Sequence, residues 1–238
     1  MTQVLLLHAF PLDSRMWEAQ RRALEGAGHD VVAPELPGPD ADIGFDVWAQ
    51  RVLGEVDGDF VAVGISMGGY LAFELWRQAA GRIPALILAD TRATPDTPEG
   101  KEGRDDAIRI LGEAGFGPFW EGLAPKLFAP SADPAVVSRA RAIADEQEIT
   151  ALTSALLTLR DRVDSRPTLA TIDVPTLVIV GEEDSLTPPQ DAGELEEGIE
   201  RARLVRIPNV GHLTPLEAPE EFNSAVLSFL DEAGPQVA

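Results

Sequence analysis

The chain has 238 residues, 45% of them hydrophobic, which is enough for one sizeable core with room for an inserted subdomain. Asp and Glu total 40 against 19 Lys and Arg, and the net charge of −21 disfavours binding to nucleic acid or anionic membranes. Without Cys, disulfides and thiolate zinc sites are excluded, and 3 His leave little room for a His-built metal site. We interpret the acidity as a solubility feature, with a salt-adapted source as the alternative.

Short apolar runs alternate with longer stretches of helical character. The runs are residues 4–7, 31–33, 60–63, 85–89 and 176–180. Apolar residues at consecutive positions are typical of parallel strands covered on both faces. Residues 203–207 differ, because Arg203 and Arg206 flank an apolar pair, and we expect this strand near an edge. The alternation predicts an α/β fold with a mainly parallel sheet of about six strands flanked by helices.

No run resembles a targeting or membrane-spanning segment. Residues 4–7 are too short for the apolar region of a signal peptide, and no basic segment precedes them. No apolar stretch approaches the roughly 20 residues that a membrane span needs. We therefore expect a soluble, cytoplasmic protein with no membrane partner.

Residues 94–166 interrupt this alternation and contain no convincing strand. Asp133-Pro134 is typical of a helix start, with Asp as the cap and Pro at the first helical position. Apolar residues then recur at helical spacing over 136–144 and again over 149–159. We predict a helical cap at 94–166, inserted into a core formed by 1–93 and 167–238; an ordinary run of surface helices is the alternative.

Polar residues lie shortly after five of the expected strands. They are His8, Ser66, Asp90, Asp184 and His212. In open parallel sheets, functional sites gather at the carboxyl ends of the strands. We therefore expect these five residues at one edge of the sheet.

Ser66 is the candidate nucleophile. It is the central residue of a G-x-S-x-G sequence at 64–68, between an expected strand and an expected helix. A Ser in this context lies on a sharp turn with its hydroxyl exposed. Flanking Gly residues are needed because a Cβ there would collide with neighbouring backbone.

A Ser hydroxyl needs a base, and His212 is the best candidate. His29 precedes its strand and so lies at the wrong end of the sheet, and His8 more plausibly shapes a turn. The imidazole in turn needs an acid to orient it. Asp184 follows the 176–180 strand and precedes His212 by a gap that fits one helix and one strand; Asp90, Glu182 and Glu183 are alternatives.

Negative charge on the attacked carbonyl oxygen needs fixed hydrogen-bond donors. The backbone N–H of Met67, directly after Ser66, is one candidate. The second is expected in the loop after the first strand, where Phe10 has an N–H and Pro11 has none. The alternative for Phe10 is that it only packs into the core.

These residues resemble the α/β-hydrolase superfamily, in its carboxylesterase and 3-oxoadipate enol-lactonase-like branch. The resemblance covers nearly the whole chain and is carried by the oxyanion loop at 8–11, the D-x-R-M-W segment at 13–17, the nucleophile elbow at 64–70, the acid strand and turn at 174–184, and Gly211-His212. Because the first strand matches the one that usually comes third in the family, one or both leading strands are expected to be missing.

The resemblance implies hydrolysis of a small carboxylic ester or lactone through an acyl-enzyme, with Ser66 attacking, His212 moving the proton and Asp184 orienting His212. It implies no metal or organic cofactor. A thioesterase or a cofactor-free perhydrolase with the same triad is an alternative, as is a non-catalytic ligand receptor or scaffold on the same fold.

The expected cap is rich in aromatic residues that could bind substrate. Phe119, Trp120 and Phe128 are candidates for a lining that faces a hydrophobic acyl or alcohol group; the alternative is that they form the core of the cap itself. A dicarboxylate lactone would need a nearby cation. The available ones are Arg104, Arg109, Lys126, Arg139 and Arg160.

Overall fold

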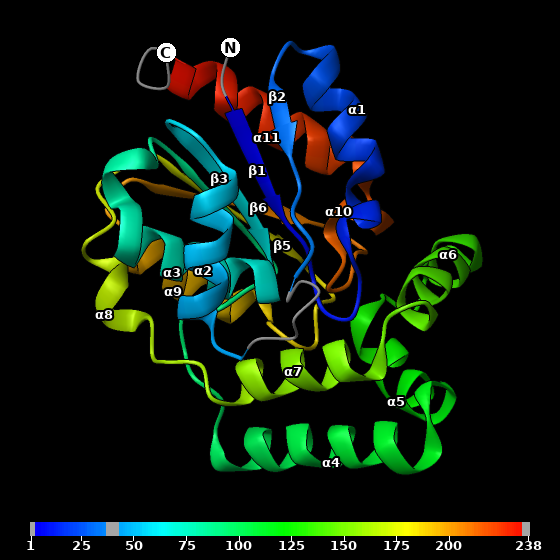
Figure 1. Cartoon of the computed structure of the whole chain (residues 1–238). Coiled ribbons are helices and arrows are strands. Elements are labelled where there is room, and N and C mark those ends of the chain that lie inside the picture. Colours follow the sequence, from blue (N-terminus) through cyan, green and yellow to red (C-terminus); the bar gives the residue numbers. More distant parts are fainter. Residues whose placement is uncertain (1–2, 37–42, 235–238) are drawn as a thin grey trace.

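The computed structural model describes residues 3–36 and 43–234 and shows a parallel sheet covered by helices on both faces (Figure 1). The strands are β1 (Gln3–Leu7), β2 (Asp30–Val32), β3 (Phe60–Ile65), β4 (Leu86–Ala89), β5 (Thr176–Gly181) and β6 (Ala202–Ile207). They form one 6-stranded sheet in the order β2-β1-β3-β4-β5-β6, and every neighbouring pair is parallel. The α/β class and the six predicted strands are confirmed.

Burial explains why consecutive apolar residues mark these strands. Every residue of β3 and of β5 is buried, because helices cover both faces of the central sheet. In β6 only Ile207 is buried, as predicted for an edge strand. The Arg203 guanidinium of β6 lies over the Phe229 ring, 5.4 Å from its centroid, and pairs with Glu232 at 2.8 Å.

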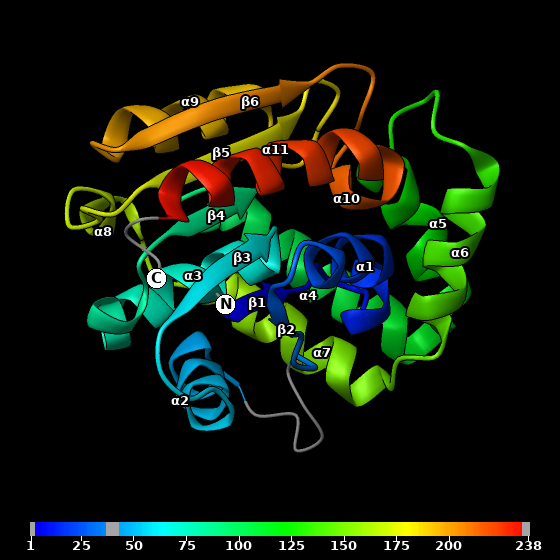
Figure 2. The same ribbon diagram turned by 90° about the horizontal axis from the view of Figure 1, so that it is seen from above.

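Alternating residues of each strand pack against opposite helical layers. On one face, Leu5, Ala62 and Val178 join a core with α2 (Phe45–Glu55), α3 (Met67–Ala79) and α9 (Pro189–Gly198). On the other, Val4, Val61 and Leu177 join a core with α1 (Glu18–Gly26) and α11 (Pro219–Ala233). Figure 2 looks across these layers from above.

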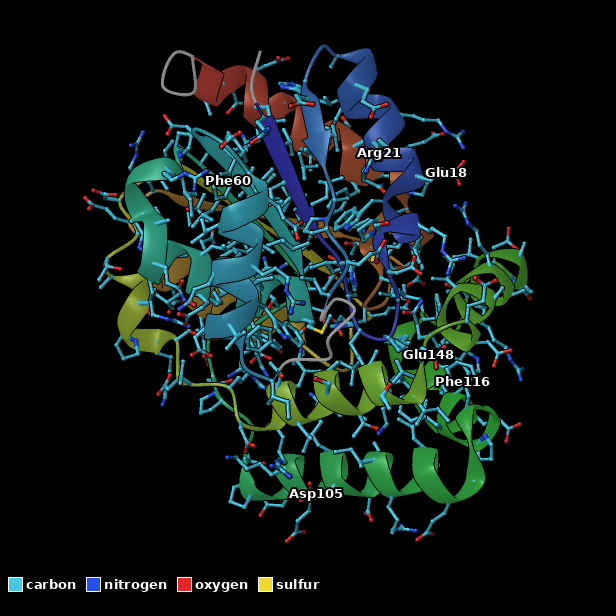
Figure 3. The ribbon with its side chains drawn as sticks, viewed as in Figure 1. Glu18, Arg21, Phe60, Asp105, Phe116 and Glu148 are labelled. Carbon is cyan, nitrogen blue, oxygen red and sulfur yellow. The ribbon has the colours of Figure 1, made fainter. Side chains whose placement is uncertain are left out.

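Residues 94–166, the cap segment, contain four main helices and no strand. These are α4 (Pro98–Ala114), α5 (Phe116–Leu127), α6 (Pro134–Asp145) and α7 (Ile149–Arg160). Asp133 caps α6 as predicted, because its carboxylate accepts the Ala135 N–H at 2.8 Å. Figure 1 places the four helices beyond the carboxyl ends of the strands, and Figure 3 shows Asp105 of α4 on the side away from the sheet.

The cap segment is attached to the rest of the chain by backbone hydrogen bonds. Its two ends meet where the Ser165 N–H donates to the Ala93 carbonyl at 2.8 Å. Further along, the His212 N–H donates to the Leu127 carbonyl at 3.0 Å, so the end of α5 holds the histidine loop. The short helices elsewhere are η1 (Ser14–Trp17), η2 (Ala80–Arg82), α8 (Arg166–Leu169) and α10 (Thr214–Glu217). Within the described ranges, no helix is both long and apolar enough to cross a bilayer.

Candidate active site

Ser66 occupies a strained turn between β3 and α3. Its φ of 51° and ψ of −113° are unusual for a residue other than Gly. Hydrogen bonds fix the turn, since the Ser66 N–H donates to the Ala89 carbonyl at 2.9 Å and Thr91 Oγ1 donates to the Ser66 carbonyl at 3.0 Å. The strain is therefore held in place by the neighbouring strand β4 and the residues after it.

The flanking glycines permit two close backbone approaches at this turn. A Cβ on Gly64 would lie 2.3 Å from the Gly68 carbonyl oxygen, and one on Gly68 would lie 2.0 Å from the Leu7 carbonyl oxygen. Both distances are far below van der Waals contact. The first turn of α3 can thus pack directly against the end of β1, as the G-x-S-x-G pattern predicts.

His212 contacts the Ser66 hydroxyl directly. Its Nε2 lies 2.8 Å from Ser66 Oγ, and its Nδ1 lies 2.8 Å from Asp184 Oδ2. The imidazole is buried, and Ser66 is partly exposed. Residues separated by 146 and 28 positions in sequence therefore form one continuous hydrogen-bonded row.

The Asp184 carboxylate is oriented by three further donors. The backbone N–H groups of Leu186 and Thr187 donate to its Oδ1 at 2.8 and 3.0 Å, and Thr187 Oγ1 donates to its Oδ2 at 2.6 Å. The Thr187 hydroxyl also lies 3.2 Å from His212 Nδ1. Our sequence reasoning did not single out Thr187, although an Asp followed three residues later by Thr is a recognisable side-chain turn.

The charges of Asp184 and His212 shift each other's pKa. Burial lowers the pKa of His212, but the charge of Asp184 and its hydrogen bond outweigh burial and raise that pKa above 6.5. Burial raises the pKa of Asp184, but the His212 charge and the hydrogen bonds from His212 and Thr187 bring it below the usual value. The pair therefore favours an ionised Asp184 beside an imidazole of increased basicity.

The alternative acids do not contact the imidazole. Glu182 and Glu183 are exposed. Asp90 is buried, but its Oδ1 accepts the Gly181 N–H at 3.0 Å and its Oδ2 accepts the Thr214 hydroxyl at 2.6 Å. Burial and the nearby Asp184 charge raise the pKa of Asp90 to about 8. Of the four carboxyl groups considered from the sequence, only Asp184 hydrogen-bonds to His212.

The other His residues lie where the sequence analysis expects them. His8 follows β1, is buried, and accepts the Leu36 N–H at 2.9 Å through Nε2 while its Nδ1 lies 3.1 Å from the Ala9 carbonyl. These contacts tie two loops together. His29 directly precedes β2, at the opposite end of the strands from Ser66.

Phe10 and Met67 both lie beside the candidate nucleophile. Met67 is the first residue of α3, directly after Ser66, and Phe10 belongs to the loop that follows β1. Within the described residues, neither backbone N–H donates to another group of the protein. The Phe10 side chain also packs edge-on against Phe119, with ring centroids 6.0 Å apart, so packing and a donor role are compatible.

A cavity extends from Ser66 toward the cap segment. A small part of about 70 Å³ is lined by Ser66 and His212, and it adjoins a larger part of about 500 Å³. Both parts are lined by Phe10, Arg92, Arg104, Leu123 and Leu186. Together they form the substrate-sized space nearest to the candidate nucleophile, and we call them the Ser66 cavity.

The predicted aromatic lining is only partly observed. Phe119 lines the larger part of the Ser66 cavity, whereas Trp120 and Phe128 line neither part. Both are buried, with their ring centroids 6.4 Å apart, and Trp120 also stacks on Phe116. These contacts favour, for Trp120 and Phe128, the alternative that they form the core of residues 94–166, and for Phe119 the lining role.

The cations of the cap segment also divide into two groups. Arg104 and Lys126 line the Ser66 cavity. Arg109, Arg139 and Arg160 line neither part and pair with carboxylates, of which only Asp106, a partner of Arg109, lines the cavity. Arg92, which the sequence analysis did not consider, lines both parts of the cavity. It lies two residues after Asp90, at the same edge of the sheet as the other polar residues.

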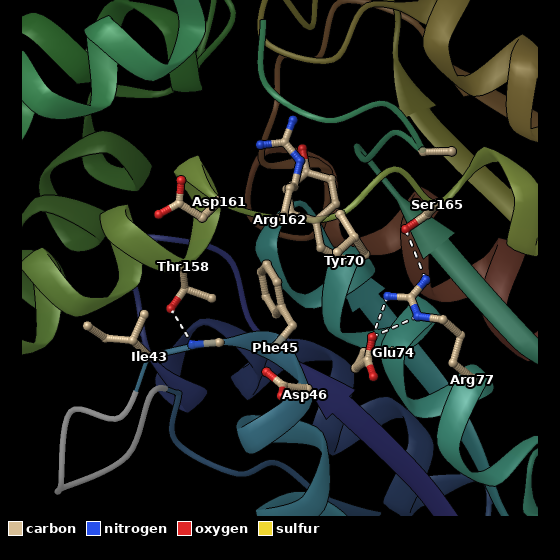
Figure 4. Close-up of a pocket in the computed structure, with 13 residues that line it drawn as sticks. Ile43, Phe45, Asp46, Tyr70, Glu74, Arg77, Thr158, Asp161, Arg162 and Ser165 are labelled. Carbon is tan, nitrogen blue, oxygen red and sulfur yellow. Dashed lines mark hydrogen bonds and ion pairs between the residues drawn. The ribbon is translucent and has the colours of Figure 1, made fainter. Parts of the chain in front are cut away.

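A separate cavity of about 500 Å³ lies between α2, α3 and the chain around residues 158–165 (Figure 4). Tyr70, one turn after Ser66 in α3, lines this cavity and also the small part of the Ser66 cavity. The Arg162 guanidinium lies over the Tyr70 ring at 4.4 Å from the centroid. Ser66, Asp184 and His212 do not line this separate cavity.

Residues 4–225 match the model of the alpha/beta hydrolase family. The AB hydrolase superfamily protein YisY of Bacillus subtilis is 28% identical over 95% of this chain and 90% of its own length. A pimeloyl-[acyl-carrier protein] methyl ester esterase of Nitrosomonas europaea is also 28% identical, over 93% of this chain and 92% of its own length.

Solved structures of hydrolases are also similar to this chain over nearly its whole length. A malate-bound thermophilic esterase from Thermogutta terrifontis has a TM-score of 0.89 and 33% identity, covering 98% of this chain and 90% of its own. The enol-lactonase from Burkholderia xenovorans has a TM-score of 0.84 and 25% identity, covering 97% and 91%. Sequence and structure together show that this chain belongs to the alpha/beta hydrolase family.

Proposed function

We propose that this protein is a serine hydrolase that cleaves a small carboxylic ester or lactone through an acyl-enzyme. The observation that carries the proposal is the row of hydrogen bonds from Ser66 Oγ through His212 to Asp184, with both contacts at 2.8 Å. An alcohol, an imidazole and a carboxylate in this order are the parts that a Ser nucleophile needs.

The reaction has two halves. His212 Nε2 takes the Ser66 proton as Oγ attacks the substrate carbonyl carbon, and it then returns that proton to the departing alcohol oxygen. Water attacks the resulting acyl-Ser66 in the second half, again with His212 as base, and the carboxylic acid leaves. Asp184 keeps His212 in the tautomer that presents Nε2 to Ser66 and stabilises the imidazolium.

The backbone N–H groups of Met67 and Phe10 are proposed to bind the oxyanion. Met67 also starts a helix of 13 residues, whose amino end favours negative charge. Loss of one such donor typically costs about 10²–10³ in rate. Two donors from different chain segments would also fix the orientation of the substrate carbonyl.

The relatives support the ester or lactone class. The structural neighbours at 33% and 25% identity are an esterase and an enol-lactonase, and one sequence relative is a methyl ester esterase. We also propose that residues 94–166 act as a cap on a core of 1–93 and 167–238. Leu123 and Leu127 of α5 line the Ser66 cavity, so the cap would cover the substrate.

The test is hydrolysis of 4-nitrophenyl butyrate by the wild type and by Ser66→Ala. We expect steady turnover by the wild type and loss of activity in the variant without loss of helical circular dichroism. A wild type that turns over once and leaves a stable covalent adduct would instead favour a ligand receptor on this fold. Parallel assays with a matched thioester and a lactone would rank the bond types.

A further inference from the structure

The small part of the Ser66 cavity is lined by positive charge, although the net charge of the whole chain is −21. In the small part beside Ser66, the permanently charged lining residues are Arg92 and Arg104, and no described Asp or Glu lines it. Both arginines also line the larger part, together with Lys126 and the acidic residues Asp96, Glu99 and Asp106. Two guanidinium groups therefore lie next to the candidate nucleophile in a protein whose net charge is strongly negative.

One buried carboxylate holds these arginines but cannot neutralise them. Asp96, whose side chain is 2% exposed, pairs with Arg162 at 2.6 Å, with Arg104 Nε at 3.1 Å and with Arg92 Nη2 at 3.3 Å. Arg162 makes the shortest contact and also donates to the Thr94 and Leu159 carbonyls, so its role is structural. Because Asp96 carries a single negative charge, it cannot also neutralise Arg92 and Arg104.

The remaining hydrogen-bond donors of Arg92 and Arg104 are largely uncommitted. Asp191 is the next carboxylate, and it lies 3.9 Å from Arg92 Nη1. Arg92 Nε is buried and has no hydrogen-bond partner among the described residues, and Arg104 contacts Asp96 through Nε alone. A guanidinium without a full partner in a partly buried site is costly unless a ligand supplies the charge.

We propose that Arg92 and Arg104 form a subsite for a carboxylate group carried by the substrate itself. The inference rests on the proposed function, and it narrows the substrate to an ester or lactone whose acyl or alcohol part is an anion. Guanidinium groups match the planar geometry of a carboxylate and bind it through paired hydrogen bonds. Arg92 follows β4 whereas Arg104 belongs to α4, so the subsite forms only where core and cap segment meet.

The position of Arg104 relative to the base agrees with this assignment. Burial lowers the pKa of His212, Asp184 raises it, and the positive charge of Arg104 lowers it. Arg104 is thus close enough to act on the base electrostatically. A substrate carboxylate bound to Arg104 would offset this effect and increase the basicity of His212 in the complex.

The experiment compares two esters with the same leaving group and acyl length. They are 4-nitrophenyl hydrogen glutarate, which carries a terminal carboxylate, and 4-nitrophenyl pentanoate, which carries a methyl group there. The measured quantity is the ratio of kcat/KM for the anionic ester to that for the neutral one. The variants are Arg104→Met and Arg92→Met, with Arg139→Met as the control, because Arg139 of α6 pairs with Glu18 and neither of these two residues lines the cavity.

We expect that ratio to fall by about 10- to 100-fold in Arg104→Met and in Arg92→Met, the range for charge-assisted hydrogen bonds, and to stay unchanged in Arg139→Met. The fall should come from the anionic ester, with the neutral ester little affected. Ratios within two-fold of wild type in both variants would overturn the subsite. Melting temperatures would identify a variant that fails to fold, and Arg104→Met keeps two of the three partners of Asp96.

An acetate ester of glycolate, compared with ethyl acetate, tests a carboxylate on the alcohol side. If the wild type hydrolyses neither type of ester, the proposed function fails, and calorimetric titration of wild type and Arg104→Met with monomethyl glutarate still decides the subsite. Binding that Arg104→Met abolishes would support it, and no binding to the wild type would overturn it.

Discussion

The Thr214 hydroxyl donates a 2.6 Å hydrogen bond to the buried carboxyl group of Asp90. Asp90 also accepts the Gly181 N–H at 3.0 Å, at the carboxyl end of β5. One side chain from the end of β4 therefore joins the loop that carries Asp184 to the loop that carries His212. Asp90 is best described as a positioning residue that sets the distance between these two loops.

Asp90→Asn should reduce kcat/KM much less than Asp184→Asn. With a pKa of about 8, Asp90 is mostly neutral at pH 7, so its replacement by Asn removes little charge. The Asn oxygen can still accept the Gly181 N–H, and the Asn amide group can donate to the Thr214 hydroxyl oxygen. Asp184→Asn removes the charge that orients His212, a change that costs about 10⁴ in kcat in well-studied triads. Steady-state rates of both variants on one ester check this, and the reverse order would move the acid to Asp90.

Asp90 should also give stability a specific pH dependence. Its pKa of about 8 in the folded protein lies above its ordinary value of 3.8, so its favourable contribution is complete below 3.8 and is lost as pH rises toward 8. The free energy of unfolding of wild type should therefore fall relative to that of Asp90→Asn between pH 5 and 8. Urea unfolding of both proteins at several pH values measures this difference, and parallel curves would contradict it.

Activity should decline on acidification. Only neutral His212 can accept the Ser66 proton, and Asp184 raises the pKa of His212 above 6.5 despite burial. The acidic limb of kcat/KM should consequently have its midpoint above that value. A pH–rate profile on a neutral ester provides the measurement, and a flat profile from pH 5 to 8 would argue against His212 as the base.

Thr187→Val should have a modest effect on activity. It removes the hydroxyl that donates to Asp184 at 2.6 Å but leaves the two backbone N–H donors in place. The loss of one such bond is worth about 1 kcal/mol, or several-fold in rate. A kcat/KM reduced as strongly as in Asp184→Asn would show that the hydroxyl has a larger role than orientation.

Gly68→Ala should destabilise the fold and impair activity. The new Cβ would lie 2.0 Å from the Leu7 carbonyl oxygen, so α3 and the loop after β1 must separate. Gly112→Ala on α4 is the matched control, because its Cβ would meet nothing within 4 Å and Ala favours helices by about 0.5–1 kcal/mol. Thermal melting should lower the transition temperature of the first variant and maintain or raise that of the second.

Much of the sheet and of the Ser66–His212–Asp184 row follows from local sequence. Buried parallel strands need apolar residues at every position, and five of the six strands described here are followed by one of the predicted polar residues at the same edge of the sheet. The helix starting at Pro134 was also readable from its cap. Thr97-Pro98 carries the same kind of signal for α4, where the Thr97 hydroxyl oxygen accepts the Gly100 N–H.

The lining of the Ser66 cavity could not be read in this way. Trp120 and Phe128 have the composition of a substrate pocket, yet both are buried in the interior packing of the cap segment. Phe119, the neighbour of Trp120, points to the cavity. Which side of α5 faces Ser66 depends on how the cap segment packs on the core. Arg92 can be identified as a lining residue only from the structure, where it contacts Asp96 of that segment.

The most direct test of the account is to identify the residue that becomes acylated or phosphonylated. Wild type and Ser66→Ala would be incubated with a 4-nitrophenyl alkylphosphonate, and the modified peptide would be located by mass spectrometry. The account predicts one adduct on Ser66, formed with loss of esterase activity, and none on the variant. An adduct on another residue with the same loss of activity, or full activity with Ser66 blocked, would contradict it.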